Sequence, residues 1–272
     1  MLIDTHAHVN FKDFRNDGDE VVKRALTEGV WMINVGSERD TSRRATEYAA
    51  RYETGVFAAV GLHPAQLKEQ EIEDKTNGET IKFSVPAEEF SREYYEALAK
   101  REKTVAIGEI GLDYYRNAAA KELQKEVFWE QLKLANDLGK PVIIHCREAH
   151  EDLLSILQSA ISDKQLAIKG VIHSFSGSLA QAKKYLDLGF SLGFNGIITF
   201  ARDYDEIVKN IPFDRILIET DCPYLTPVPL RGKKNEPSYV KYVAQKVAEL
   251  REVNFEEVAE QTTKNAKKLF QI

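Results

Sequence analysis

The stretch Ile3-Asp4-Thr5-His6-Ala7-His8-Val9, near the start of the chain, decides the fold. It predicts a buried β-strand, in which alternate side chains face the same side. We therefore expect the rings of His6 and His8, two residues apart, on one face of that strand. Neutral imidazole is a common ligand of divalent metals, but a single His-x-His pair is equally consistent with packing in a core. The pair becomes informative if further ligands end other strands.

The composition is that of an ordinary globular protein. Of the 272 residues, 43% are hydrophobic and 29% are charged, which excludes a disordered chain. No apolar run reaches the roughly 18 residues of a membrane helix, and the N-terminus carries no secretion signal. Cys146 and Cys222 are too few for a disulfide scaffold. We expect a cytoplasmic monomer without membrane association or an obligate protein partner.

The net charge of −6 constrains how the protein can meet nucleic acid. It argues against a broad basic binding surface. Bound divalent cations can still supply positive charge locally. Any contact with nucleic acid is therefore expected at the mouth of an active site and at small basic loops.

Short apolar runs alternate with longer amphipathic segments along the chain, which predicts βα units and a parallel sheet. Several of the short runs are continuous and rich in Val and Ile, as is typical of strands buried on both faces. The eight predicted strands are Leu2–Val9, Trp31–Gly36, Val56–Leu62, Thr104–Glu109, Pro141–Cys146, Ala167–His173, Phe190–Phe194 and Arg215–Glu219. This pattern predicts an α/β fold, a (β/α)8 TIM barrel formed by residues 1–272 as one domain.

Helical periodicity is clearest from Lys121 to Leu138, where Leu123, Val127 and Leu134 are expected on the apolar face. Gly139 then predicts a C-cap. Similar patterns predict helices over Asp17–Glu28, Thr41–Arg51, Glu148–Ala160, Leu179–Leu188, Tyr239–Leu250 and Phe255–Phe270.

The segment from Leu67 to Ala87 departs from this alternation. It is polar, contains Asn77-Gly78 and Pro86, and lacks apolar periodicity. We expect an extended excursion after the third strand, such as a small hairpin, on the side where functional loops gather. A surface insertion tolerated without a function is the simpler interpretation.

Further candidate ligands end other strands. Glu109 ends the fourth predicted strand, His145 and His173 lie at the ends of the fifth and sixth, and Asp221 follows the eighth. A carboxylate that ends an apolar strand is costly unless it is paired or binds a cation, whereas a lone histidine there is more often a core residue. Asp113 is expected in the loop after Glu109. Because active sites of barrels lie at the carboxyl ends of the strands, we expect these candidates to converge with the first strand.

Six groups exceed the needs of one tetrahedral zinc and suit two divalent ions that share a carboxylate. We assign the ligands as His6, His8 and Asp221 for one ion, His145 and His173 for the other, and Glu109 as the bridge. Magnesium, manganese and zinc are the candidate ions. Cys146 neighbours His145 on a strand, so its side chain should face the opposite way and is expected to pack in the core.

The same residues carry a family resemblance. The motifs are Ile3-Asp4-Thr5-His6-Ala7-His8, Gly61-Leu62-His63-Pro64, Gly108-Glu109-Ile110-Gly111-Leu112-Asp113-Tyr114, His145-Cys146-Arg147-Glu148, His173-Ser174-Phe175-Ser176-Gly177, Glu219-Thr220-Asp221-Cys222-Pro223-Tyr224-Leu225-Thr226-Pro227 and Arg231-Gly232-Lys233-Lys234-Asn235-Glu236-Pro237. In this order they resemble the TatD family of metal-dependent deoxyribonucleases, within the amidohydrolase-like barrels. The resemblance covers essentially the whole chain.

The resemblance implies a (β/α)8 barrel of the metal-dependent hydrolase type and hydrolysis of DNA phosphodiesters, in some members as a 3′ exonuclease. It also implies a divalent metal centre at the six positions reached above. One position departs from the family pattern: Ala65 stands where many members carry a second histidine after Gly-x-His-Pro. We expect any difference in substrate choice at this part of the rim.

The expected chemistry uses the ions and two carboxylates. Two ions a few Å apart can activate water and neutralise the charge that develops on a phosphodiester. With neutral histidines, two divalent ions and the carboxylates of Glu109 and Asp221 leave about two positive charges facing the substrate. Glu109 and Asp221 are the predicted catalytic residues. Asp221 is expected to accept the proton of the attacking water, or to act as a ligand only.

Three residues are predicted to bind substrate, each with a structural alternative. His63 either reaches a substrate phosphate or braces the turn at Pro64. Arg147 presents a planar fork suited to phosphate, or pairs with Glu148 or another acid at the rim. Arg231, in a short basic run, either steers a polyanion or is solvated surface.

Two other functions remain open. An amidohydrolase-type esterase, lactonase or amidase acting on a small molecule is possible because one barrel hosts many chemistries. Many such enzymes bridge their metals with a carbamylated lysine, whereas the fourth strand here ends in Glu109. A metal-binding protein without catalysis is the second, against which the complete set of six ligands argues. We predict a deoxyribonuclease with two divalent ions, acting on DNA from the 3′ end.

Overall fold

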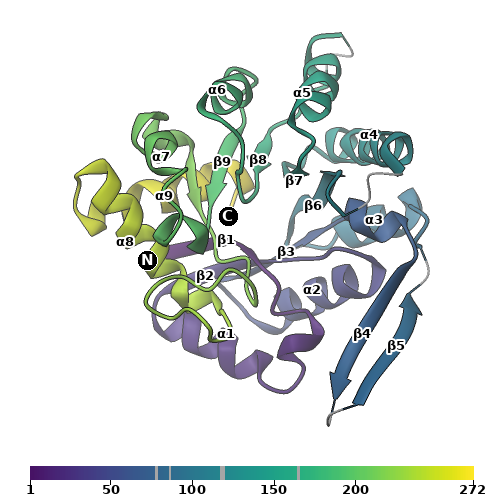
Figure 1. The fold of residues 1–272 in the computed structure, drawn as a ribbon, viewed down its shortest axis with the longest axis horizontal. Helices are drawn as coiled ribbons and strands as arrows, with labels where there is room; N and C mark the ends of the chain where they lie inside the picture. The colour runs from purple at the N-terminus through teal and green to yellow at the C-terminus, as the bar shows by residue number, and fades with distance from the viewer. Residues whose placement is uncertain (77–78, 86, 117–119, 164–165) are drawn as a thin grey trace.

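The barrel predicted from the sequence is confirmed by the computed structural model, which describes residues 1–76, 79–85, 87–116, 120–163 and 166–272. Eight parallel strands form a nearly closed barrel in the order β1-β2-β3-β6-β7-β8-β9-β10 (Figure 1). The strands are β1 (Leu2–Ala7), β2 (Val30–Val35), β3 (Val56–Val60), β6 (Thr104–Asp113), β7 (Val142–Arg147), β8 (Gly170–Ile172), β9 (Ser191–Phe194) and β10 (Ile216–Ile218).

Each predicted strand corresponds to one of these, with bounds that differ by a few residues. The largest difference is in β6, which continues to Asp113, so the prediction of a loop there is wrong. The strand continues because its pairing with β7 does, through Gly111 opposite His145 and Asp113 opposite Arg147.

Helices alternate with the barrel strands. They are α1 (Gly18–Thr27), α2 (Arg39–Arg51), α3 (Arg92–Ala99), α4 (Lys121–Leu138), α5 (His150–Gln158), α6 (Leu179–Asp187), α7 (Asp205–Asn210), α8 (Val240–Arg251) and α9 (Phe255–Phe270). The bounds of α4 and α9 are as predicted, and Gly139 caps α4 in the left-handed conformation. The short helices α3 and α7 were not predicted from the sequence.

The buried face of α4 contains Val127 and Leu134, as predicted, but not Leu123. Leu123 is 44% exposed, whereas Gln124 and Gln131 are buried. Gln131 bonds to the backbone N–H and carbonyl of Leu62, and Gln124 does the same with Asp113. Each glutamine amide thus forms hydrogen bonds with the backbone N–H and the carbonyl of one residue at the end of a strand or just after it. These polar contacts hold α4 against β6 and against the segment after β3.

The excursion after β3 contains the small hairpin that we expected. Strands β4 (Gln70–Thr76) and β5 (Glu79–Val85) pair antiparallel and lie outside the barrel wall (Figure 1). Asn77-Gly78 and Pro86 lie outside the described residues.

A layer of apolar side chains fills the amino end of the barrel. It draws on seven barrel strands, with Ile3, Ile33, Val35, Ala59, Ala106, Ile143, Val171 and Leu217. Ala266 and Phe270 of α9 complete it, so this helix closes that end. The candidate ligands lie at the other, carboxyl end of the barrel.

The barrel closes between β10 and β1. Ala7 forms a parallel bridge with Cys222, and the backbone N–H of Asp221 donates to the carbonyl of His6. Asp4 accepts hydrogen bonds from the backbone N–H and the hydroxyl of Thr220. This seam brings His6 and Asp221, far apart in the sequence, side by side.

Register shifts re-aim the candidate ligands. In a regular strand, residues three positions apart face opposite sides. Ile3 and His6 are three positions apart, yet both side chains lie inside the barrel, Ile3 in the apolar layer and His6 above it. The pairing of β1 shifts between Asp4 and Ala7. The pairing of β6 shifts between Ile107 and Ile110, next to Glu109. At each shift one strand has an extra residue relative to its partner. Such bulges are common beside active sites because they change the direction in which a side chain points.

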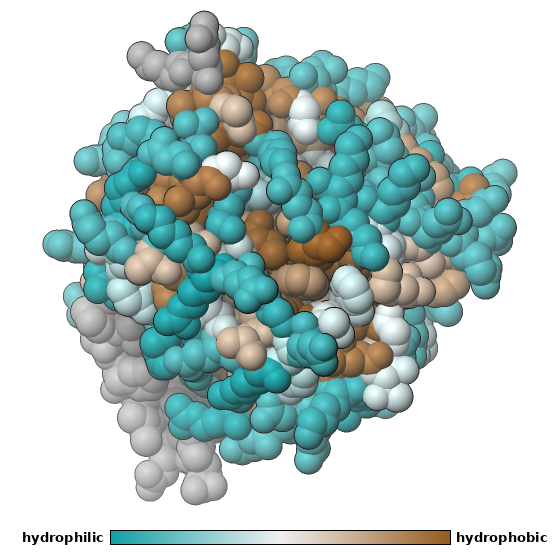
Figure 2. Space-filling model, turned by 180° about the vertical axis from the view of Figure 1, so that it is seen from behind, coloured by the Kyte–Doolittle hydropathy of each residue, from teal (hydrophilic) through white to brown (hydrophobic). Residues whose placement is uncertain are grey.

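The outer surface is mixed. None of the helices in the described ranges is long and apolar enough to cross a membrane. On the face shown in Figure 2, hydrophilic side chains cover most of the surface and hydrophobic residues form patches between them.

A substitution at Gly111 tests the tight approach of β6 to β7. A Cβ at this position, where φ is +141°, would lie 2.0 Å from the carbonyl oxygen of His145. We expect Gly111→Ala to lower the free energy of unfolding by at least about 3 kcal/mol in urea denaturation. Gly29 is the matched control, because it has φ of +72° with nothing within 4 Å of a Cβ; Gly29→Ala should cost about 1 kcal/mol. Equal losses would contradict the steric explanation.

Candidate metal centre

The structure brings the six predicted ligands together at the carboxyl end of the barrel. Nε2 of His6 and Nε2 of His8 lie 3.0 Å apart, so the expected placement of both rings on one side is confirmed. Oδ1 of Asp221 lies 3.3 Å from Nε2 of His8. The donor atoms of His6, His8 and Asp221 all lie within 4.8 Å of one another, the spacing of groups that could share one ion.

Glu109 lies at the centre of the cluster. Its Oε1 lies 2.8 Å from Nδ1 of His145, 3.5 Å from Nε2 of His63 and 3.9 Å from Nε2 of His173. Its Oε2 lies 3.5 Å from Nε2 of His6. Burial alone would raise the pKa of Glu109, but the neighbouring histidines outweigh burial and hold it well below the ordinary value. An ionised carboxylate among four histidines is suited to the bridging position.

Two histidines have an acceptor on the side of the ring away from the cluster. Nδ1 of His8 lies 2.8 Å from the carbonyl oxygen of Val35, which can only accept, so its proton lies on Nδ1 and the lone pair of Nε2 faces the cluster. Nδ1 of His173 lies 2.8 Å from Oε1 of Glu219, a fully buried carboxylate. Burial lowers the pKa of His173, but Glu219 and the carboxylates of the cluster outweigh burial and raise it to about 10. This arrangement, with an acceptor behind each imidazole, is typical of metal-ligating histidines.

His63 has the opposite arrangement. Its Nδ1 accepts a hydrogen bond from the backbone N–H of Ala65, and burial lowers the pKa of His63 to about 3, so the ring is neutral. The proton therefore lies on Nε2, the atom that faces Glu109. His63 thus braces the turn at Pro64 and also presents an N–H donor, rather than a lone pair, to the cluster.

The sequence reasoning missed the roles of Asp113 and Glu219. Asp113 is fully buried, and its Oδ2 lies 3.0 Å from Nε2 of His145. His63, Asp113 and His145 form a further group with metal-like spacing, but the N–H of His63 argues against an ion there. The signal that could have identified Asp113 is the two-residue repeat of a β-strand. Glu109 and Asp113 are four residues apart, so they lie on the same face of β6 when that strand continues to Asp113. Glu219 was quoted from the sequence without a role.

These additional carboxylates change the expected charge. Glu109, Asp113, Glu219 and Asp221 are all within 3.9 Å of an imidazole nitrogen. With neutral histidines, two divalent ions and four carboxylates balance to about zero. The surplus of about two positive charges expected from two carboxylates therefore falls to about zero when Asp113 and Glu219 are counted with the same two ions.

Three arginines lie at the rim of the cluster. Arg147 forms no ion pair among the described residues, and its guanidinium lies over the ring of Tyr115, 3.8 Å from the centroid. Arg231 donates to the carbonyl of Thr226 and lies over another ring. Arg116, which the sequence reasoning missed, is 54% exposed and has NH1 3.6 Å from Oδ2 of Asp113. Phosphate contact by Arg147 and Arg231 stays a prediction.

Two further expectations from the sequence concern Cys146 and the ligands of the second ion. Cys146 faces away from the cluster, with Sγ 3.3 Å from Nδ1 of His150 on α5, so its expected role in packing is confirmed. The assignment of His145 and His173 to one ion stays a prediction, because the groups with metal-like spacing in the described chain do not contain both.

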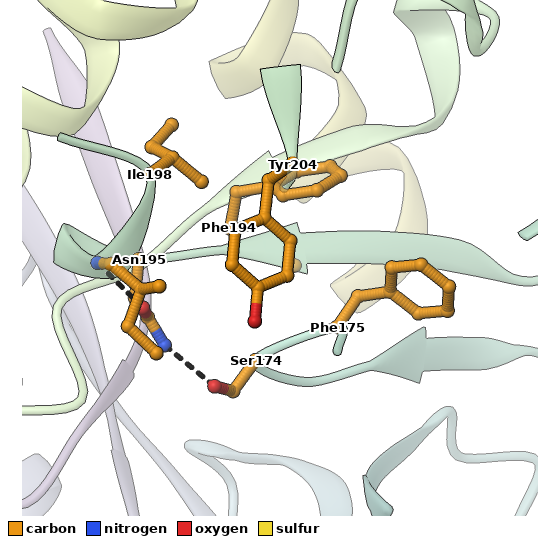
Figure 3. Close-up of a pocket in the computed structure, with 8 residues that line it drawn as sticks. Ser174, Phe175, Phe194, Asn195, Ile198 and Tyr204 are labelled. Carbon is orange, nitrogen blue, oxygen red and sulfur yellow. Dashed lines mark hydrogen bonds between the residues drawn. The ribbon is translucent and has the colours of Figure 1, made fainter. Parts of the chain in front are cut away.

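A small pocket of about 10 Å³ is lined by Ser174, the residue after His173. Figure 3 shows Ser174 and Asn195 on one wall and the hydroxyl of Tyr204 pointing toward them. Nδ2 of Asn195 donates to Oγ of Ser174, and the backbone N–H of Ser174 donates to Oε1 of Glu219 (Figure 3 shows the first bond). This chain of hydrogen bonds fixes the carboxylate that orients His173.

The donor set fits divalent metal. Imidazole nitrogens and carboxylate oxygens converge from β1, β6, β7, β8 and the segment after β10. Within the described residues, Nδ1 of His6, Nδ1 of His173 and Oε2 of Glu219 are buried without a hydrogen-bond partner, whereas Nε2 of His6 faces the cluster. Such a mixed nitrogen and oxygen set suits zinc, manganese or iron.

Comparison with known proteins places the chain among metal-dependent hydrolases. A family model described as TatD related DNase matches residues 3–271. A relative from Bacillus subtilis strain 168, named uncharacterized metal-dependent hydrolase YabD, is 44% identical over 100% of both chains. The 3′-5′ ssDNA/RNA exonuclease TatD of Erwinia amylovora is 34% identical over 99% of each chain. The crystal structure of YJJV, a TatD homologue from Escherichia coli K12, has a TM-score of 0.84 at 31% identity and covers 100% of this chain and 98% of that chain.

The positions of the ring protons predict which histidines bind metal. We expect His173→Ala to weaken the binding of zinc or manganese by more than about ten-fold, because a lone pair is lost. His63→Ala should bind with an affinity within about three-fold of the original, because only an N–H donor is lost. Isothermal titration of the metal-stripped proteins measures both. Equal losses in the two variants would contradict the tautomers inferred here.

Glu219→Gln tests the residue behind His173. An amide cannot hold the ring proton as a carboxylate does, so metal affinity should fall by roughly 10- to 100-fold with the fold retained. Glu236→Gln is the matched control, since Glu236 is also buried but pairs with Arg24 and Ser238 instead of a candidate ligand. Titration with zinc and a thermal melt of each variant check this, and a loss of affinity in both would count against a specific role for Glu219.

Proposed function

Because the chain belongs to the TatD-related DNase family of metal-dependent hydrolases, we propose that it hydrolyses DNA phosphodiester bonds with two divalent ions, from the 3′ end. The observation that carries the proposal is the convergence of the six ligands predicted from strand ends. His6, His145 and His173 lie within 3.9 Å of Glu109, and His8 lies 3.3 Å from Asp221. The name of the Erwinia amylovora relative, an exonuclease, supports the substrate and the direction.

The catalytic carboxylates have different surroundings. When bound, two divalent ions would lower the pKa of a water molecule and stabilise charge on a phosphoryl oxygen. The side chain of Asp221 is 16% exposed, against 7% for Glu109. Asp221 therefore meets incoming water and substrate, and it accepts the proton of the attacking water at Oδ1 or Oδ2. Glu109, enclosed by histidines, holds the two halves of the site together.

The phosphate is bound by donors at the edge of the cluster. The N–H at Nε2 of His63 points into the cluster and donates to a phosphoryl oxygen of the substrate. Arg147 and Arg231 contact flanking phosphates, and Arg116 adds a further guanidinium beside Asp113. The four carboxylates cancel the charge of the two ions, so the positive charge that attracts the substrate comes from these arginines.

Two pockets in the described part of the chain lie away from the candidate ligands. One, of about 10 Å³, lies beside Ser174. The other, of about 560 Å³ and lined by Met1, Phe255 and Lys267 among others, lies along α9 at the opposite end of the barrel. Neither is lined by any of the six candidate ligands, so neither indicates a small-molecule substrate at the metal centre.

Cleavage of end-labelled DNA tests the proposal. The metal-stripped protein would be assayed on 3′-labelled and 5′-labelled single strands after addition of magnesium, manganese or zinc. We expect the 5′-labelled strand to shorten stepwise from its 3′ end. In Glu109→Ala the rate of cleavage should fall by more than about 100-fold. Glu109 is itself a predicted ligand, and its loss should cost more than the loss of a residue that only orients a ligand, such as Glu219.

Several outcomes would change the assignment. Fragments from the middle of the strand would indicate an endonuclease with the same chemistry. Metal binding without cleavage of DNA by any ion would overturn the proposal and favour a carboxylic ester, lactone or amide as substrate. The Glu236→Gln variant, altered away from the cluster, serves as the control for preparation and folding.

A further inference from the structure

The outward face of α9 carries a row of charges that changes sign at its middle. Exposed charged residues recur every four positions along this face, at Glu256, Glu260, Lys264 and Lys268. Side chains at this spacing form one ridge along a helix. We call these four residues the α9 ridge. Its first half is acidic and its second half is basic.

The helix dipole does not account for the two central charges of the ridge. Acidic residues in the first turn of a helix and basic residues in the last turn are favoured by the dipole, but this effect falls off within one turn of each end. Glu260 and Lys264 lie in the middle of α9. A different interaction must explain their order.

The charges of the α9 ridge have no partner within the chain. On α2, α3, α4, α7 and α8, charged side chains three or four positions apart form ion pairs. Glu260 and Lys264 are also four positions apart, yet no residue of the ridge forms an ion pair with another described residue. These charges are therefore available to a second molecule.

An open groove runs beside the ridge. It has a volume of about 560 Å³, and Met1, Phe255, Ala259 and Thr263 are among the residues that line it. Ala259 and Thr263 are small and lie four positions apart, so a second helix can approach the backbone of α9 closely. Met1, at the edge of the groove, is 53% exposed.

Other apolar side chains at the amino end of the barrel are incompletely covered. Those that pack on the apolar layer but stay partly exposed are Trp31, Phe57, Val105, Leu269 and Ile272. Figure 2 looks onto this end from behind the view of Figure 1 and shows hydrophobic side chains in the middle of the face. An apolar patch bordered by charged residues is typical of a protein–protein interface.

We propose that this face is the interface of a two-fold dimer, in which α9 packs antiparallel against α9 of a second copy of this chain. A two-fold axis that passes between Glu260 and Lys264 places each Glu260 opposite Lys264 of the other copy. The same axis places Glu256 opposite Lys268. A two-fold interface requires a surface that is complementary to itself, and the change of sign along the α9 ridge provides one. The proposal departs from the monomer expected from the sequence.

Such a dimer leaves both candidate metal centres open. α9 closes the amino end of the barrel, whereas the candidate ligands lie at the carboxyl end. The mouths of the two copies therefore face away from each other. The inference is independent of the proposed hydrolysis, and its test needs no assay of activity.

Sedimentation velocity of the full-length protein tests the proposal. Over a roughly hundred-fold range of concentration, the original protein should pass from monomer to dimer. Glu260→Lys alone and Lys264→Glu alone should each raise the Kd of the dimer by more than about ten-fold, because like charges then face each other across the interface.

Mixing the two variants gives the decisive measurement. In an equimolar mixture of Glu260→Lys and Lys264→Glu, both central contacts pair a basic side chain of one variant with an acidic side chain of the other. A heterodimer should therefore form with a Kd within about three-fold of the original. A weakened helix cannot produce this recovery, because it would weaken the mixture as much as each variant alone. Glu126→Lys makes the same change of charge at an exposed position of α4 and should leave the Kd unchanged.

Three outcomes would overturn the proposal. A monomer at every concentration would leave the groove to a different partner. A dimer whose Kd is unchanged in both single variants would have its interface on another face. A loss of dimer in both variants without recovery on mixing would show that the ridge charges do not face each other, and a thermal melt of each variant would show whether the fold itself was weakened.

Discussion

The burial of ionisable groups at the carboxyl end of the barrel is the constraint on which the rest of the structure depends. Unpaired charges in a protein interior are expensive, so each carboxylate of the cluster faces imidazole nitrogen, as Asp113 does with His145 and Glu219 with His173. One atom in the described part of the chain stays without such compensation, because Oε2 of Glu219 is buried without a hydrogen-bond partner.

The barrel meets this constraint by separating two layers. Apolar side chains and α9 fill the amino end, and the register shifts in β1 and β6 let one strand serve both layers. Ile3 and His6 both point inward although they are three residues apart, as do Ala106 and Glu109. A regular strand would have sent one member of each pair to the helices. The irregular pairing is thus what allows a packed floor beneath a polar site.

Much of this could be predicted from the sequence because it is local or periodic. The bounds of α4 follow from helical spacing and Gly139, and the six candidate ligands follow from the rule that barrel sites lie at strand ends. The roles of Asp113 and Gln124 could not be predicted in this way. They depend on how far β6 continues beside β7 and on which face α4 presents, both of which are set by contacts between segments far apart in the sequence. Register shifts have the same origin.

The charge of the site then determines what the rim must do. With four carboxylates around the candidate ligands, two divalent ions leave about no surplus charge to attract a phosphate chain, and the whole chain carries −6. Long-range steering by a basic surface is therefore excluded as the main source of affinity. For the proposed phosphodiester substrate, short-range contacts remain, in which the guanidinium groups of Arg147 and Arg231 would each meet a single phosphate. Each of these guanidinium groups lies against an exposed aromatic ring. Binding of this kind should depend weakly on salt compared with proteins that release many counterions.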